Sequence, residues 1–192
     1  MLRLRLMQAR SRGVAQPHTL SSMPHESRRD EFLISTDKSL IDLDAVHDVL
    51  VRVYWSERIP RDTVKRGIDN SMVFGIYDES GAPRRQVGFA RVITDKATFA
   101  YLSDVFVIES CRGRGLSKWL MDVILAHPDL QGLRRFCLLT RDAHGLYARY
   151  GFKPMPDPTG TWNCGTPRST RGGRNRTFPA RRARGRLPTW AR

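Results

Sequence analysis

An apolar strand that runs through a glycine-bearing turn into an amphipathic helix constrains the fold of this chain more than any other feature. Residues 104–120 read DVFVIESCRGRGLSKWL, and the apolar positions from Leu116 onward recur at helical spacing. Such a turn directs free backbone N–H groups and the positive end of a helix dipole at one point, which suits a phosphate. Gly113 and Gly115 let an anion approach the backbone and tolerate positive φ. The cationic side chains beside the turn are Arg112, Arg114 and Lys118.

The turn matches neither of the two commonest phosphate loops. A Walker loop needs Gly-x-x-x-x-Gly-Lys followed by Ser or Thr, and the chain contains no such run. A dinucleotide fingerprint needs a third glycine where Lys118 stands. What remains, Arg112-x-x-Gly115-x-Ser117, resembles the pyrophosphate loop of the GNAT-type N-acetyltransferases, written Gln/Arg-x-x-Gly-x-Gly/Ala. Ser117 is a mild departure, because serine is small and its hydroxyl could donate to a phosphate.

A second motif of the same family follows downstream. Residues 146–152, LYARYGF, are similar to the family's Leu-Tyr-x-x-x-Gly-Phe, which spans the last helix and the start of the next strand. Two matches in this order are far more specific than either alone. The resemblance covers roughly residues 31–156. It implies an α/β architecture, the GNAT acyltransferase fold, with a mixed central sheet, helices on both faces and splayed parallel strands that form the acetyl-CoA site.

The apolar patterning predicts the element order β-α-α-β-β-β-α-β-α-β, which is the order of that fold. Strands are expected over residues 31–36, 71–78, 86–94, 98–108, 136–140 and 152–155. Helices are expected after an Asp42 N-cap, after Pro60 to about Gly67, from the glycine turn to His127, and over 143–150. The crossover from 98 to 140 should be right-handed, which makes its two strands parallel.

The resemblance implies where acetyl-CoA, the expected acyl donor, would bind. The strand before the turn would pair with the pantetheine arm through the backbone of Val105, Phe106 and Val107. A backbone amide near Phe106 would stabilise the oxyanion. The pyrophosphate would lie on the N–H groups of the loop formed by Arg112, Gly113, Arg114, Gly115, Leu116, Ser117 and Lys118. No metal is expected.

Acetyl transfer to an amine also needs proton transfers, and the candidates are few. Tyr147 matches the family tyrosine near the cofactor sulfur, and a phenol with a pKa of about 10 can protonate a thiolate. The alternative for Tyr147 is simple packing, the role that we expect for Tyr150. Asp104 is the candidate base, with His144 or a chain of waters as alternatives. Ser103 stands where the spermidine/spermine acetyltransferases carry a glutamate, which counts against a polyamine.

The acceptor itself is expected to be a primary amine of a small molecule or peptide, because specificity in this fold resides in the first two helices and their loops. Tyr54 and Trp55 either flank the acceptor entrance or pack at its rim. Arg91 and Asp95 either line the acceptor side or form an ion pair at a strand end.

The formal net charge of +14 is concentrated at the two ends of the chain. Residues 1–25 contain four arginines, residues 159–192 contain nine, and neither segment has an acidic residue, so the middle is nearly neutral. Their low apolar content predicts a disordered basic extension over 1–28 and a disordered arginine-rich tail over 158–192, around a GNAT domain over 29–157. A reading-frame shift in the gene would also explain the C-terminal segment, and we give this origin the same weight as a functional tail.

Two competing functions follow from these features. The first is a nucleic-acid-binding protein that acts through its arginine-rich tails. The tails carry no aromatic-interleaved motif and no zinc spacing, so nucleic acid is expected only through them. The second is a catalytically silent acyl-CoA-binding domain, which Ser103 and Ser117 leave open.

The apolar runs and the cysteines of the sequence predict where the protein is located. No run of about 18 apolar residues occurs, so no membrane partner is expected. Cys111, Cys137 and Cys164 lack metal-site spacing and are expected to be reduced thiols of a cytoplasmic protein. A homodimer is left open.

The charge distribution generates a first prediction. A chain cut before about Glu26 and after about Pro158 should remain folded and nearly neutral, because the removed segments hold almost all the net charge and little apolar periodicity. Thermal unfolding of the truncated protein measures this. Loss of a cooperative transition would show that one of the removed segments is structural.

Overall fold

The structure is a computed structural model that describes residues 23–155. The arginine-rich tail expected over 158–192, and residues 1–22 of the expected basic extension, lie outside the described residues.

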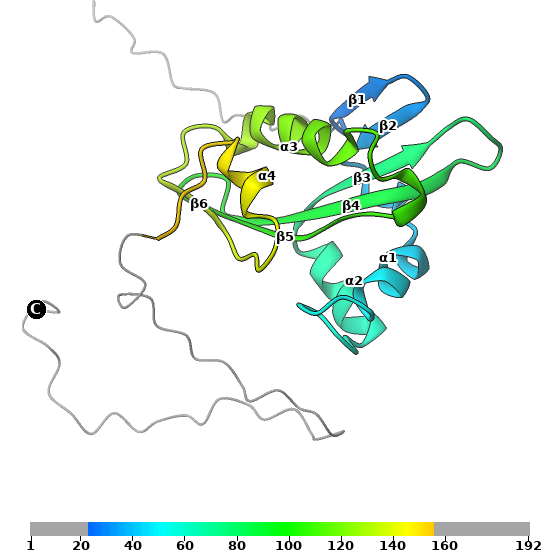
Figure 1. The fold of residues 1–192 in the computed structure, drawn as a ribbon, viewed down its shortest axis with the longest axis horizontal. Coiled ribbons are helices and arrows are strands. Elements are labelled where there is room, and N and C mark those ends of the chain that lie inside the picture. Colours follow the sequence, from blue (N-terminus) through cyan, green and yellow to red (C-terminus); the bar gives the residue numbers. More distant parts are fainter. Residues whose placement is uncertain (1–22, 156–192) are drawn as a thin grey trace, which may run out of the picture. The chain divides into compact units, whose positions relative to one another are not determined.

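A six-stranded sheet whose strands follow one another in chain order is the frame of the described residues (Figure 1). The strands are β1 Glu26–Arg29, β2 Phe32–Ser35, β3 Met72–Asp78, β4 Arg85–Thr94, β5 Phe99–Val107 and β6 Arg135–Leu138. Neighbouring strands are antiparallel from β1 to β5, whereas β5 and β6 are parallel. The mixed sheet and its parallel pair confirm the expected fold class.

Helices cover both faces of this sheet (Figure 1). Helices α1 Leu43–Leu50 and α2 Arg61–Asp69 lie on one face, and α3 Leu116–Ala126 and α4 His144–Ala148 lie on the other. Three short 3-10 turns span Lys38–Leu40, Glu109–Cys111 and Pro128–Leu130. Each face has its own apolar core. Phe89 packs with α1 and α2 in one core cluster, and Leu120 and Ile124 of α3 are fully buried in the other.

The helix boundaries follow the expected local signals. The Asp42 carboxylate caps α1 by accepting from the Asp44 and Ala45 N–H groups at 3.1 and 3.0 Å. Helix α2 begins after Pro60 and runs to Asp69, two residues beyond the expected end at Gly67.

The Arg91 side chain lies beside Gly67 of α2. A Cβ built at Gly67 would lie 3.4 Å from the Arg91 guanidinium carbon, which is an ordinary van der Waals contact, so this packing does not require glycine.

Two elements differ from the sequence expectation. Strand β1 was not expected, because its residues are polar and become a strand only by pairing with β2 in a hairpin. The strand extends across residues 28 and 29, where the boundary between the basic extension and the domain was expected. The strand expected over residues 152–155 is wrong, since none of these residues is in a strand. Pro154 has no N–H to donate to a ladder, which explains the difference.

Strand β5 is irregular near its middle. Phe89 pairs with Phe106 and Arg91 pairs with Ser103, so one residue of β4 faces two residues of β5 at a bulge. Asp104 occupies the bulge with φ of 56°, which is uncommon for a residue other than glycine. The bulge bends the strand just before the glycine turn.

The turn between β4 and β5 generates a pH prediction. The Thr98 hydroxyl donates to the Asp95 carboxylate at 2.6 Å, and the Phe99, Thr98 and Ala97 N–H groups donate to it at 2.9, 2.9 and 3.0 Å. The hydroxyl first, and then these N–H groups, hold the pKa of the Asp95 carboxyl far below the usual value. Because the folded pKa is depressed, the stabilisation is present above the unfolded pKa of 3.8 and is lost as the pH falls toward the folded one.

Asp95→Asn should therefore unfold at lower urea than the unmodified protein at pH 7. The gap between the two midpoints should narrow as the pH falls from about 4 to about 2. A gap that does not change with pH would contradict the assignment.

Candidate functional site

The two parallel strands part in the middle of β5. Their pairing runs from Phe99 opposite Arg135 to Leu102 opposite Leu138, where β6 ends. Strand β5 continues to Val107, so residues 103–107 have no β6 partner along that edge. An extended molecule could pair with these backbone groups as an additional strand would.

The end of β5 packs its side chains against both cores, with Val107 buried and Val105 and Phe106 partly buried. The Ile108 N–H donates to the Val87 carbonyl at 2.9 Å, and alternation along the strand turns the backbone of Val107 away from β4. The Val107 side chain is buried, Val105 packs in the α3 core, and the Phe106 ring lies 6.1 Å from that of Phe89.

The glycine turn leads from β5 into α3. Gly115 is the N-cap of α3 with φ of 73°, Gly113 has φ of 79°, and no side chain caps the helix. Leu116 is buried and anchors the first turn in the core. The Arg112 N–H donates to the Glu109 carbonyl at 3.1 Å, whereas the first N–H groups of α3 have no side-chain acceptor, which suits a phosphate.

The sequence places three cationic side chains beside this loop, and two of them, Arg112 and Arg114, have partners within the protein. The Arg112 Nε donates to the Val107 carbonyl at 3.3 Å. Arg114 forms an ion pair with Glu31, and their hydrogen bond raises the pKa of Arg114 and lowers that of Glu31. Arg29 also reaches the loop, which the sequence analysis missed because a short polar strand carries no periodic signal.

Tyr147 lies in α4, within the apolar core that α3 covers. Its ring centroid is 6.0 Å from that of Phe152, and the residue is 8% exposed. Burial raises the pKa of its phenol, and nearby Tyr54 and Asp142 raise it further. The group therefore stays protonated at neutral pH, as a proton donor must be.

Tyr150 has a structural role, as expected. Its hydroxyl donates to the Lys118 carbonyl at 2.8 Å and so ties the end of α4 to the first turns of α3.

The segment that follows α1 packs against the loop that precedes α4. The Tyr54 hydroxyl accepts from the Arg141 N–H at 3.0 Å, and the Arg141 guanidinium lies 3.7 Å from the Tyr54 ring centroid. The Trp55 ring packs edge-on against Tyr54 at 4.9 Å. These contacts join the α1 side of the sheet to the loop before the helix of Tyr147.

Asp104 opens into a hollow of about 490 Å³ between α2 and the sheet. Its carboxylate pairs with the Arg91 Nε at 2.7 Å and accepts from the Ser103 hydroxyl at 3.0 Å. The rest of the lining is mixed: apolar side chains such as Ile59 and Phe89 stand beside the polar Thr63 and the cationic Arg66. Arg91 thus pairs with Asp104, while Asp95, the alternative partner considered above, caps the β4–β5 turn.

The three expected catalytic residues are not gathered in one cluster. Asp104 lies in the hollow below α2, Tyr147 lies in the core below α3, and His144 is exposed at the start of α4. The unpaired edge of β5, residues 103–107, begins next to the bulge that holds Asp104.

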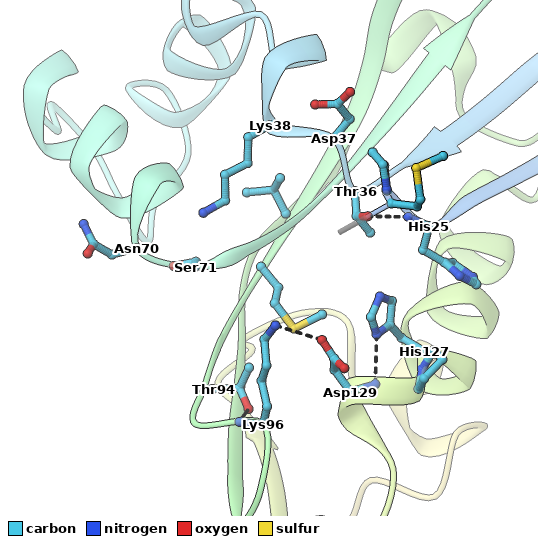
Figure 2. A pocket seen from close by; sticks show the side chains of 15 residues that line it. His25, Thr36, Asp37, Lys38, Asn70, Ser71, Thr94, Lys96, His127 and Asp129 are labelled. Atoms are coloured by element: carbon cyan, nitrogen blue, oxygen red, sulfur yellow. Dashed lines mark hydrogen bonds and ion pairs between the residues drawn. The ribbon is translucent and has the colours of Figure 1, made fainter. Parts of the chain in front are cut away.

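A larger polar cleft of about 660 Å³ lies at the other end of α3 (Figure 2). His127, the C-cap of α3, lines it with His25, whose ring centroid is 5.1 Å away. Across the cleft, Lys96 pairs with Asp129 at 2.8 Å. No sequence motif pointed to this cleft, and α3 separates it from Gly115.

The described residues offer neither a metal-binding group nor a membrane-spanning helix. Within residues 23–155, no three His, Cys, Asp or Glu side chains are grouped so that they could hold a metal ion. None of the helices in this range is long and apolar enough to cross a membrane.

Known proteins resemble this chain over the same elements. The family model of the acetyltransferase (GNAT) domain matches residues 69–154. A Gibberella zeae protein whose name places it among acetyltransferases is 31% identical over 145 residues, which cover 66% of this chain and 81% of that protein. Serotonin N-acetyltransferase 2 of Oryza sativa, a chloroplastic protein, is 29% identical over 66% of this chain and 64% of its own length.

A solved structure agrees with these relatives. A crystal structure from Xanthomonas campestris pv. campestris, described as a member of the GNAT family, is 52% identical with a TM-score of 0.66 and covers 76% of this chain and 96% of its own. The parted strands, the uncapped glycine turn and these likenesses lead to one conclusion: the chain belongs to the GNAT family of acetyltransferases.

Proposed function

We propose that this protein transfers the acetyl group of acetyl-CoA to a primary amine of a small molecule or peptide. The observation that carries the proposal is the continuity of the unpaired β5 edge with the uncapped glycine turn. An extended pantetheine arm would pair with residues 103–107, and the pyrophosphate of the coenzyme would meet the N–H groups of residues 113–118, since that of Arg112 is bonded to Glu109. Acetyl-CoA supplies the acetyl group and leaves as CoA.

The chain's own residues provide the proton transfers and the charge stabilisation. A backbone amide near Phe106 would donate to the developing oxyanion, and the outward-facing Val107 amide is the best placed. The Tyr147 hydroxyl makes no hydrogen bond to another residue within 23–155, so it is free to donate its proton to the leaving thiolate.

Asp104 is the base that we propose for the amine. Its ion pair with Arg91 holds the carboxylate at the bulge, where it can take up a proton from the amine directly or through water. His144 is the alternative base, and its exposed place at the start of α4 would require a water relay.

The acceptor would enter the hollow between α2 and the sheet. The hollow has the Asp104 carboxylate and apolar side chains, and Arg66 and Arg91 also line it, so its apolar surface is the feature that would select an acceptor with an apolar body. The rice relative's name specifies serotonin as its acceptor, and an arylethylamine has this composition. We therefore rank arylethylamines first among acceptors and polyamines last.

An amine panel tests this proposal. Acetyl-CoA would be incubated with the full chain and with an arylethylamine, a polyamine, an amino sugar, an amino acid or a lysine peptide, and CoA release would be measured. Release above the amine-free rate with at least one amine supports the proposal. Binding of acetyl-CoA without release for any class would favour the silent acyl-CoA-binding domain.

The remaining expectations concern partners and location. Nucleic-acid binding through the arginine-rich tails concerns segments outside the described residues and stays a prediction. We also place the protein in the cytoplasm, where its free thiols Cys111 and Cys137 would stay reduced.

Gly115→Asp should weaken acetyl-CoA binding by more than about a hundredfold. The new carboxylate would stand where the pyrophosphate belongs, and it would come within reach of Arg29, whose guanidinium nitrogens lie 3.9 Å from a Cβ built at Gly115. Gly132→Asp is the matched control, since Gly132 also has positive φ and open space around it. Calorimetric titration of both variants decides, and equal losses in the two would contradict the loop assignment.

Tyr147→Phe should lower kcat by about 10²–10⁴-fold, because it removes a proton donor and keeps the buried ring. Acetyl-CoA affinity and melting temperature should change little. Tyr150→Phe is the control, because it removes a hydroxyl that bonds a carbonyl of α3, and it should leave kcat nearly unchanged. A fully active Tyr147→Phe variant would mean that water protonates the thiolate.

A further inference from the structure

We infer that Arg29, at the end of β1, is a phosphate-binding residue of the coenzyme site, supplied by the N-terminal hairpin. The inference rests on the proposed donor, acetyl-CoA. Arg29 lies outside residues 69–154, the part of the chain that the family model matches, so this contact belongs to a segment with no counterpart in that match.

The hairpin β1–β2 places Arg29 against the glycine turn. Arg29 pairs with Phe32 across the hairpin, and the intervening Asp30 has φ of 51°. The Arg29 Nη2 donates to the Arg114 carbonyl at 3.0 Å, and its guanidinium carbon lies 4.8 Å from the centre of the Trp119 ring of α3. These two contacts hold the guanidinium beside the first turn of α3.

The loop is the part of the chain that this guanidinium faces. Both terminal nitrogens lie 3.9 Å from a Cβ built at Gly115, the N-cap of α3. The guanidinium therefore lies next to the residue at which the helix begins, within reach of a phosphate bound at that N-terminus.

The charges near the loop favour Arg29 over Arg114 as the anion ligand. Arg114 is neutralised by Glu31, and its guanidinium lies 4.5 Å from the centre of the Phe32 ring, on the hairpin. Arg29 has no carboxylate within 4.0 Å among residues 23–155, so its charge is not compensated there.

The chemistry of the side chain suits a phosphate. A guanidinium has five N–H donors in a planar fork, and its contact with the Arg114 carbonyl leaves most of them free. The fork matches two oxygens of a phosphate, and such charge-assisted bonds are among the strongest hydrogen bonds in proteins. CoA has two such groups, its pyrophosphate and its 3′-phosphate, and either could meet Arg29.

Calorimetric titrations on the full chain test the inference. The variants are Arg29→Gln, Arg29→Lys and the matched control Arg28→Gln, which removes the same charge from the neighbouring residue, where Arg28 pairs with Glu26 and Glu79. The ligands are CoA, 3′-dephospho-CoA and pantetheine. Melting temperatures would be measured alongside.

Arg29→Gln should weaken CoA binding by about tenfold or more, Arg29→Lys should restore part of the affinity, and Arg28→Gln should stay within about twofold of the unmodified protein. Pantetheine, which has no phosphate, should bind Arg29→Gln and the unmodified protein equally, whereas lost packing would weaken both ligands. A loss that disappears with 3′-dephospho-CoA assigns the contact to the 3′-phosphate, and a loss that persists assigns it to the pyrophosphate.

Three results would overturn the inference. If Arg29→Gln binds CoA as the unmodified protein does, Arg29 has no phosphate contact, although the proposed donor stands. If Arg28→Gln loses as much affinity, the effect is one of net charge. If the unmodified protein does not bind CoA at all, the proposed donor fails and this inference fails with it.

Discussion

The end of the pairing between β5 and β6 is the constraint on which the rest of the site depends. The strands remain paired up to Leu102 and Leu138, and only β5 continues. A sheet edge exposed in this way presents unpaired N–H and C=O groups, which proteins usually cover or shorten. Here the 3-10 turn Glu109–Cys111 and the glycine turn lead from this edge to a helix N-terminus without a side-chain cap, so the unpaired part of β5 and the start of α3 follow each other closely along the chain.

The bulge at Asp104 connects this edge to the second face of the sheet. A residue with φ of 56° in a strand costs free energy, on the order of 1–3 kcal/mol, and such conformations concentrate at functional sites. The ion pair with Arg91 helps to hold it, since both side chains are mostly buried, with 19% and 11% exposed for Arg91 and Asp104. Removal of either partner would leave a poorly solvated charge, which is strongly destabilising. The pair therefore ties the geometry of the bulge to the hollow below α2.

Local signals in the sequence predicted most of the fold. The Asp42 cap, Pro60, the glycines of the turn and Pro128 each act through neighbouring backbone, so their effects can be read without knowledge of the fold. Strand β1 could not be found in this way, because four polar residues have no alternation and gain their structure only by pairing with β2. The prediction of a strand over residues 152–155 failed for the opposite reason. Its apolar residues suggested a strand, but Pro154 cannot donate a hydrogen bond to a neighbouring strand.

The side-chain partners of the candidate site were beyond sequence reasoning. The motif alone was enough to propose Val105, Phe106 and Val107 as coenzyme contacts, because the proposed contact uses only their backbone. The pairing of Arg91 with Asp104 and of Arg114 with Glu31 depends on contacts between segments far apart in the chain. The basic residues near the motif therefore indicated an anionic ligand. The arginine that we propose as its contact, Arg29, lies in the N-terminal hairpin, far from the loop in the sequence.

Hydrogen–deuterium exchange with and without acetyl-CoA tests the central claim most directly. The account predicts that acetyl-CoA slows exchange of the amides in residues 103–107 and 113–118 and leaves the segments around Lys96 and His127, in the cleft of Figure 2, unchanged. Slower exchange around that cleft, with no change along β5 and the glycine turn, would contradict the account and place the coenzyme at the other end of α3.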